Sequence, residues 1–229
     1  MTLTKFGIRE WGLSGLVALV LITVFIVLAI FYAPITGFSL ALFVFIVWLA
    51  IAAFFRNPCR KIPADVQLMM SPADGVVKDI GIVSDHGIEP FAGQDALRIG
   101  IFLSVLNVHL NRATSDLELT YKHYRKGRYL DARHPDCHKE NEAMTIGGTA
   151  KIKDFEFPMA IRQVSGAIAR RIVCPVEIGD KIERGAIYGM IKFGSRTELY
   201  IPVSDDFDVQ VKIGDKVSAG ITTMVKCNK

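Results

Sequence analysis

The sequence has few cysteines and no arrangement of them that is typical of a disulfide framework or a paired-cysteine zinc site. The four cysteines among its 229 residues stand far apart and form no CxxC pair, so we expect free thiols in a reducing compartment. No long block of lysine and arginine occurs, and the net charge is only +4. A nucleic-acid-binding protein would need a basic stripe or a reader motif, and neither is present.

Only one polar segment, residues 134–142, has a composition that could supply metal ligands. These candidates are His134, Asp136, Cys137, His138, Glu140 and Glu142. Their spacing matches neither paired CxxC ligands nor the HExxH of helical zinc sites. We therefore favour a solvated loop over a metal centre and expect no metal.

Long apolar runs are abundant in the first quarter of the chain. Residues 16–33 contain only Thr23 as a polar residue, and residues 38–55 contain only Ser39. Each run of about 18 residues would make a helix of roughly 27 Å, just enough to cross a bilayer core. The link 34–37 contains proline and glycine, so residues 1–62 are predicted to form a membrane-anchoring helical hairpin.

Two placements of this hairpin remain open, one that spans the bilayer and one that dips into a single leaflet. A secretory signal would have one shorter apolar core and a small-residue cleavage site, which this segment lacks.

The basic residues Lys5 and Arg9 precede the hairpin, and Arg56, Arg60 and Lys61 follow it. By the positive-inside rule, we expect a cell-membrane protein with residues 63–229 on the cytoplasmic side.

Residues 63–229 read as a mainly β domain, because short β-type runs alternate with glycine, proline and aspartate and no long amphipathic helix pattern appears. The segment Gly179–Gly185, Gly-Asp-Lys-Ile-Glu-Arg-Gly, recurs 35 residues later as Gly-Asp-Lys-Val-Ser-Ala-Gly at Gly214–Gly220. This turn is similar to those of barrel-sandwich domains such as lipoyl domains, whose short sheets are related by a quasi-twofold. We therefore expect an α+β chain whose larger domain has barrel-sandwich-like character.

Three short segments carry residues capable of chemistry. They are Ser-Pro-Ala-Asp-Gly at 71–75, Asn-Val-His-Leu-Asn-Arg at 107–112 and Phe-Gly-Ser-Arg at 193–196. Taken singly, Asp74 could cap a turn, His109 could be a structural histidine, and Gly194-Ser195 could form a hairpin turn. The three make a catalytic group only if the fold brings them together.

In combination these segments resemble the phosphatidylserine decarboxylase family, specifically its short bacterial form with a hydrophobic N-terminus. The resemblance covers essentially the whole chain. It includes Phe-Phe-Arg-Asn-Pro at 54–58, Asn-Glu at 141–142 and the segment 166–173.

The resemblance implies a proenzyme that cuts itself between Gly194 and Ser195. Ser195 would attack the carbonyl of Gly194 with His109 as general base and Asp74 orienting the imidazole, because a serine hydroxyl is a poor nucleophile without a base. Elimination and hydrolysis would leave a pyruvoyl group on residue 195. The products would be a large chain, 1–194, and a small chain, 195–229, which remain together as a heterodimer. A higher oligomer stays open.

The implied activity is the decarboxylation of phosphatidylserine in the membrane to phosphatidylethanolamine. The covalent pyruvoyl group would form a Schiff base with the serine amine and accept electrons, with neither pyridoxal phosphate nor a metal. Arg112, Arg170 and Arg171 are conceivable partners for the substrate's anionic groups, since guanidinium suits phosphate and carboxylate.

The chain departs from longer relatives at two places. They have a second histidine where this sequence has Arg112, so His109 could serve both self-cleavage and later protonation. They also commonly have proline and then glycine in the stretch that reads Ala-Thr-Ser-Asp-Leu at 113–117 here. Two other functions stay open: a pyruvoyl decarboxylase for a related serine phospholipid, and a membrane-tethered, non-enzymatic adaptor of lipoyl-like shape.

Overall fold

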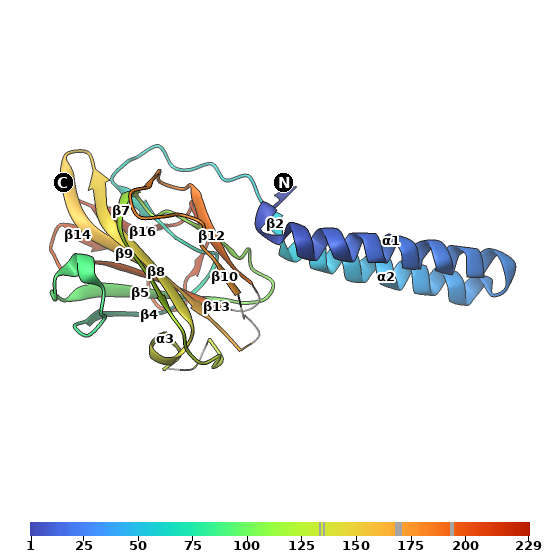
Figure 1. Cartoon of the computed structure of the whole chain (residues 1–229). Coiled ribbons are helices and arrows are strands. Elements are labelled where there is room, and N and C mark those ends of the chain that lie inside the picture. The colour runs from blue at the N-terminus through green and yellow to red at the C-terminus, as the bar shows by residue number, and fades with distance from the viewer. Residues whose placement is uncertain (133, 135, 168–170, 193–194) are drawn as a thin grey trace. The chain divides into compact units, whose positions relative to one another are not determined.

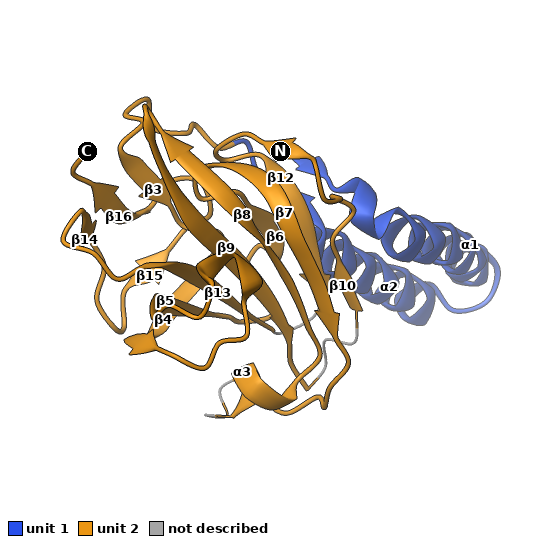
Figure 2. Ribbon diagram, turned by 60° about the vertical axis from the view of Figure 1, so that its left-hand side comes forward, with its two compact units in different colours: residues 1–59 blue, residues 60–229 orange. Residues whose placement is uncertain are grey.

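The chain forms two compact units, residues 1–59 and 60–229 (Figures 1 and 2). They are seen in a computed structural model that describes residues 1–132, 134, 136–167, 171–192 and 195–229.

The first unit is built on two long helices that lie side by side (Figure 1). Its elements are β1 (Thr2–Leu3), the 3-10 helix η1 (Lys5–Gly7), α1 (Ile8–Phe31), α2 (Pro34–Phe54) and β2 (Arg56–Asn57). By length and composition both helices can cross a membrane. At 1.5 Å per residue they are about 36 and 32 Å long, against a hydrocarbon core of about 30 Å.

The turn of this hairpin is shorter than the sequence indicated. Tyr32 and Ala33 separate the helices, and the predicted link 34–37 forms the first turn of α2 instead. Proline fits there because the first helical residue needs no N–H partner. Gly37 then lies against Ala29, where a Cβ atom would come within 2.6 Å of the neighbour's Cβ. Glycine therefore permits the close approach of the two helices.

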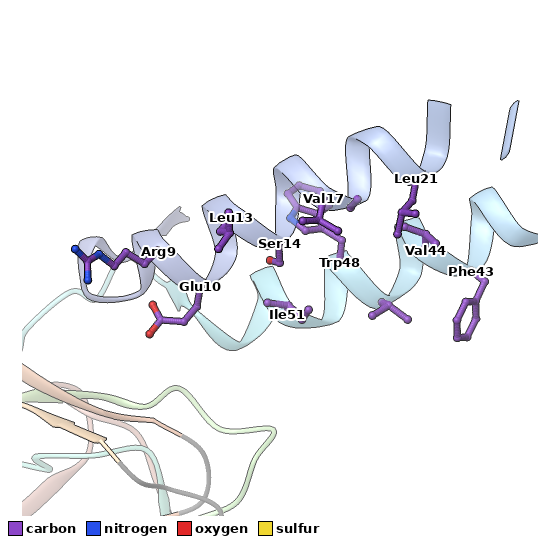
Figure 3. Close-up of a pocket in the computed structure, with 12 residues that line it drawn as sticks. Arg9, Glu10, Leu13, Ser14, Val17, Leu21, Phe43, Val44, Trp48 and Ile51 are labelled. Atoms are coloured by element: carbon purple, nitrogen blue, oxygen red, sulfur yellow. The ribbon is translucent and has the colours of Figure 1, made fainter. Parts of the chain in front are cut away.

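Several polar side chains of the hairpin bond to helix backbone. Thr23 Oγ1 donates to Leu19 O at 2.9 Å, and Trp48 Nε1 donates to Trp11 O at 3.3 Å. A groove between the helices is lined mostly by apolar side chains, with the charged Arg9 and Glu10 at one end (Figure 3). This surface suits lipid better than water.

The second unit is mainly β, which confirms the predicted fold class. Its strands are β3 (Leu68–Met70), β4 (Gly75–Val83), β5 (Ala96–Leu103), β6 (Leu110–Arg112), β7 (Asp116–Arg125), β8 (Ala143–Ile152), β9 (Phe155–Ser165), β10 (Arg171–Val173), β11 (Lys181–Ile182), β12 (Ile187–Lys192), β13 (Ser195–Pro202), β14 (Phe207–Val209), β15 (Lys216–Val217) and β16 (Thr223–Cys227). The described helices are η2 (Glu89–Phe91) and α3 (Cys137–Glu140).

An eight-stranded antiparallel sheet organises this unit, in the order β11-β7-β8-β9-β13-β5-β4-β15. Two three-stranded sheets, β10-β12-β6 and β14-β16-β3, accompany it. Alternate residues of a strand point to opposite faces, so Leu199 and Ile201 of β13 enter the hydrophobic core with Ile99 and Ile101 of β5. Arg196, Glu198 and Tyr200 of β13 therefore point to the opposite face, which we call the outer face of the sheet.

The repeated Gly-Asp turn builds both edges of the large sheet. β11 follows the first copy and pairs with β7, while β15 follows the second copy and pairs with β4. The hydrogen bonds also match, since Gly179 N donates to Leu119 O and Gly214 N donates to Val77 O. Gly179 and Gly214 have φ values of 97° and 98°. The quasi-twofold expected from the sequence is therefore present.

Candidate active site

Ser195 is the first residue of β13 and lies between two other strands. It pairs with Leu103 of β5 on one side and with Ser165 of β9 on the other. The residue is fully buried, and its Oγ atom has no hydrogen-bond partner among the described residues. Gly194, the other half of the expected cleavage site, lies outside the described residues. A buried hydroxyl without a partner is costly, so this serine is a strong candidate for chemistry.

A buried amide network holds the strands around Ser195. Asn111 of β6 donates through Nδ2 to Thr197 Oγ1 at 3.0 Å and accepts at Oδ1 from Gln163 Nε2 at 2.8 Å. The same Nδ2 reaches Pro72 O at 3.4 Å. One side chain thus ties β13, β9 and the loop 71–75 together. The sequence showed Asn111 only as part of a motif, because its partners lie far away along the chain.

His109 lies immediately before β6 and is fully buried. Its Nδ1 is 3.0 Å from Asn107 O. Because a carbonyl only accepts, Nδ1 carries the hydrogen, and the neutral ring then has its lone pair on Nε2. Ile191 N donates to His109 O at 3.1 Å, which places the histidine beside the strand that leads to Ser195.

The loop before His109 is itself fixed. Asn107 Oδ1 accepts from the backbone N of Ser104 at 2.9 Å and from its hydroxyl at 2.7 Å. This turn presents the Asn107 carbonyl to the imidazole, so local sequence sets the tautomer.

Asp74 has two other partners in this structure. Its Oδ2 accepts from Arg60 Nη2 at 2.7 Å, and its Oδ1 accepts from Ala219 N at 2.7 Å. The side chain is 12% exposed. The expected role of Asp74 in orienting His109 stays a prediction, and the pairing with Arg60 is new, since the sequence showed Arg60 only as a basic flank of the hairpin.

The quasi-twofold gives Asp74 a counterpart. Asp116 Oδ1 accepts from Arg184 N at 2.7 Å, just as Asp74 accepts from Ala219 N, and Arg184 and Ala219 occupy the same place in the two repeats. Asp116 is exposed, whereas Asp74 is buried. Part of the work of Asp74 is therefore to support a turn, and burial together with the Arg60 contact distinguishes it from Asp116.

Two more buried polar residues, Ser165 and Glu142, are connected to Ser195 through backbone pairing. Ser165, the strand partner of Ser195, has a buried Oγ without a partner among the described residues, and its backbone N donates to Glu142 O at 2.9 Å. Glu142 accepts at Oε1 from Tyr124 OH at 2.7 Å, a bond that raises the pKa of Tyr124. Its Oε2 is buried with no partner within the described part of the chain. Such unpaired groups are typical of a site that receives a ligand.

The three arginines considered as anion partners are placed differently. Arg112 donates through Nη1 to Gly185 O at 2.8 Å. Arg171 begins β10, pairs with Lys192 and is exposed. Arg170 lies outside the described residues. Over the described residues, no group of three or more histidine, cysteine, aspartate or glutamate side chains could hold a metal.

Comparison with known proteins shows which family this chain is similar to. The model of the family described as phosphatidylserine decarboxylase matches residues 49–224. A phosphatidylserine decarboxylase proenzyme of Rhodopirellula baltica is 38% identical, over 97% of this chain and 87% of that protein. Proenzymes of the same name from Carboxydothermus hydrogenoformans and Geobacter metallireducens are 41% and 42% identical, over 82% and 87% of this chain and 84% and 88% of their own lengths.

Proposed function

The chain belongs to the phosphatidylserine decarboxylase family, and on that premise we propose that it decarboxylates phosphatidylserine with a pyruvoyl group made from its own Ser195. The observation that carries the proposal is the buried Oγ of Ser195, which has no partner among the described residues and stands next to the expected scissile bond. A hydroxyl already removed from water is available for attack on the adjacent carbonyl.

The chain's own residues would perform the self-cleavage. His109, with its lone pair on Nε2, takes the proton of Ser195, whose oxygen attacks the Gly194 carbonyl and displaces the amide nitrogen to give an ester. Loss of the Cα proton of residue 195 then expels the Gly194 carboxylate and leaves a dehydroalanine. Water converts this residue to a pyruvoyl group and releases ammonia.

The pyruvoyl group would supply the electron sink for loss of carbon dioxide from the substrate's serine. The surroundings of Ser195 fit such a group, since the residue is fully buried between β5 and β9. Its strand partner Ser165 also has a buried Oγ without a hydrogen-bond partner among the described residues. After carbon dioxide leaves, a protein group must protonate the α-carbon, and His109 is our candidate.

The two products would stay together. β13 of the small chain pairs with β5 over eight positions and with β9 over six, and both strands belong to the large chain. β15 and β16 add pairings with β4 and β3. Cleavage before residue 195 cuts the covalent link and leaves these ladders in place, so we propose a heterodimer.

The apolar hairpin would bring the reaction to its substrate. Helices of 24 and 21 residues are long enough to span, which favours crossing over a shallow dip. The basic residues on both flanks would keep both ends of the hairpin, and therefore the β unit, on the cytoplasmic side.

A lipid assay tests the function directly. The purified full-length chain in detergent is given phosphatidylserine in mixed micelles, and phosphatidylethanolamine is measured. We expect product with the wild type and with Ser204→Ala, an exposed serine of the small chain, and none with Ser195→Ala. Activity in Ser195→Ala would refute the pyruvoyl mechanism. If the wild type turned over only a different serine phospholipid, that lipid would be the substrate instead of phosphatidylserine. A wild type that stayed uncut and inactive would favour the membrane-tethered, non-enzymatic adaptor.

A further inference from the structure

A cavity of about 480 Å³ lies on the outer face of the large sheet. Its floor comes from four strands, with Arg98 of β5, Arg125 of β7, Arg162 of β9 and Tyr200 of β13. The segment 83–87 and two residues of α3 complete the lining. None of these residues has a part in the proposed reaction.

The cavity is separate from Ser195. Tyr200 is five residues after Ser195 on the same strand, and residues an odd number apart point to opposite faces of a sheet. The contacts agree, since Thr197 bonds Asn111 on the inner face while Tyr200 bonds Arg162 on the outer face. The cavity therefore needs an explanation of its own.

Positive charge exceeds negative charge around the cavity floor. Arg98, Arg162 and the neighbouring Arg196 share two carboxylates, those of Asp79 and Glu198, at distances from 2.6 to 4.0 Å. Burial alone would raise the pKa of Glu198, but Arg196, Tyr200 and the other arginines outweigh burial and lower it, so this carboxylate is ionised. Three guanidinium groups thus face two carboxylates.

Arg125 adds a fourth guanidinium that has no carboxylate among its described partners. It donates to two backbone carbonyls, His138 O at 2.8 Å and Asn141 O at 3.0 Å. The four arginines and two carboxylates leave an excess of two positive charges. At the rim, the opposite charges of exposed Asp85 and Lys139 offset each other. His86 Nδ1 accepts from Ile88 N and Nε2 lies against Gln94 O, which is the pattern of a neutral imidazole.

Two donors of these arginines are also unused. Arg98 Nε and Arg125 Nε are buried and have no hydrogen-bond partner among the described residues. Burial, and after it the charge of Arg162, lowers the pKa of Arg125, as expected for a cation that lacks a counterion. Excess charge, and unused donors on residues that line one cavity, both favour an anion with several acceptor oxygens.

We propose that this cavity binds a phosphate group, held by Arg98, Arg125 and Arg162. A phosphate dianion matches the excess of two charges, and guanidinium forks suit its oxygens. The volume leaves room for a substituent beyond the phosphate itself. The phosphate belongs either to a small soluble ester or to a lipid headgroup.

Calorimetric titration of the full-length chain in detergent tests this, with inorganic phosphate as the probe and chloride holding the ionic strength constant. We expect saturable binding by the wild type. Arg125→Gln should weaken phosphate binding about ten- to a hundredfold, because a hydrogen bond between charged groups is lost. The variant leaves no carboxylate unpaired, because the described partners of Arg125 are backbone carbonyls. The matched control Arg128→Gln removes an arginine whose side chain is 75% exposed and should change affinity less than about twofold.

Arg125→Lys keeps the charge without the fork and should bind with intermediate affinity, which separates recognition from a folding defect. The same titrations with glycerol 3-phosphate and with a lysophosphatidic acid in the micelle distinguish the sources. Equal affinities indicate a soluble ester, and a clear preference for the lipid indicates a headgroup. Absence of saturable phosphate binding by the wild type, or unchanged affinity in Arg125→Gln, would overturn the proposal.

Discussion

His109 combines complete burial with a hydrogen bond that leaves Nε2 as its basic nitrogen. If this nitrogen accepts the Ser195 proton, His109→Ala should slow self-cleavage about 100- to 10,000-fold. His123→Ala is the control, since that histidine is exposed and stacks on Tyr121. A time course on denaturing gels measures both. If His109→Ala cleaved itself at the wild-type rate, another group would have to be the general base.

Asp74 and Asp116 form a natural pair for separating chemistry from turn support. Each accepts from an equivalent turn N–H, but Asp74 alone is buried and bonded to Arg60. We expect Asp74→Asn to leave the chain largely uncut and Asp116→Asn to be processed at nearly the wild-type rate. Equal rates of cleavage in the two variants would reduce Asp74 to a structural residue.

Sequence reasoning at this scale identified candidate residues but not their contacts. Asp74, His109 and Ser195 were identifiable because each lies in a segment that resembles a family motif. The Asn107 carbonyl that fixes the imidazole and the Arg60 contact of Asp74 were not, because both depend on how loops fold back in space. Asn111 was equally hidden, since its partners are 52 and 86 residues away.

At the scale of elements, the two closing glycines of the repeat, Gly185 and Gly220, lie against Ile62 in the linker that follows the hairpin. Gly185 and the opening glycine of the same copy, Gly179, allow this contact to be tested. Gly185 has a φ of 79°, and an added Cβ would lie 2.5 Å from Ile62 Cδ1. Gly179 has a φ of 97° but open space around it. Gly179→Ala should therefore cost about 1 kcal/mol of unfolding free energy from backbone strain alone.

Gly185→Ala should cost about 1–3 kcal/mol more, because the new methyl group collides with Ile62. Chemical denaturation measures both values, and the double variant Gly185→Ala/Ile62→Ala should recover part of the difference. Equal losses of unfolding free energy in the two single variants would show that Ile62 does not pack tightly against Gly185.

The repeat also shows what sequence can predict about elements. Two Gly-Asp turns 35 residues apart indicated a quasi-twofold, and the structure confirms it at the two edges of one sheet. The eight-strand order could not be predicted, because pairings such as β13 with β5 join residues about a hundred positions apart. The hairpin turn was misplaced by two residues because proline both breaks helices and begins them.

At the scale of the whole molecule, the apolar hairpin predicts how the large chain meets the membrane. Both helices are apolar along nearly their whole length, so binding should be hydrophobic and survive washing with 1 M salt, a concentration at which charge attraction is screened beyond about 3 Å. Detergent should release the chain. Membrane fractionation followed by immunoblotting measures this, and release by salt alone would contradict a membrane-embedded hairpin.

The central claim is that Ser195 becomes the pyruvoyl group, and the intact mass of the purified protein tests it most directly. We predict two chains, residues 1–194 and 195–229, with the second lighter by one ammonia than a chain that begins with a free serine. In Ser195→Ala we predict one full-length mass. A small chain with an unmodified serine at its start would mean ordinary peptide hydrolysis, and a single full-length mass for the wild type would mean no processing, so either result would contradict the account.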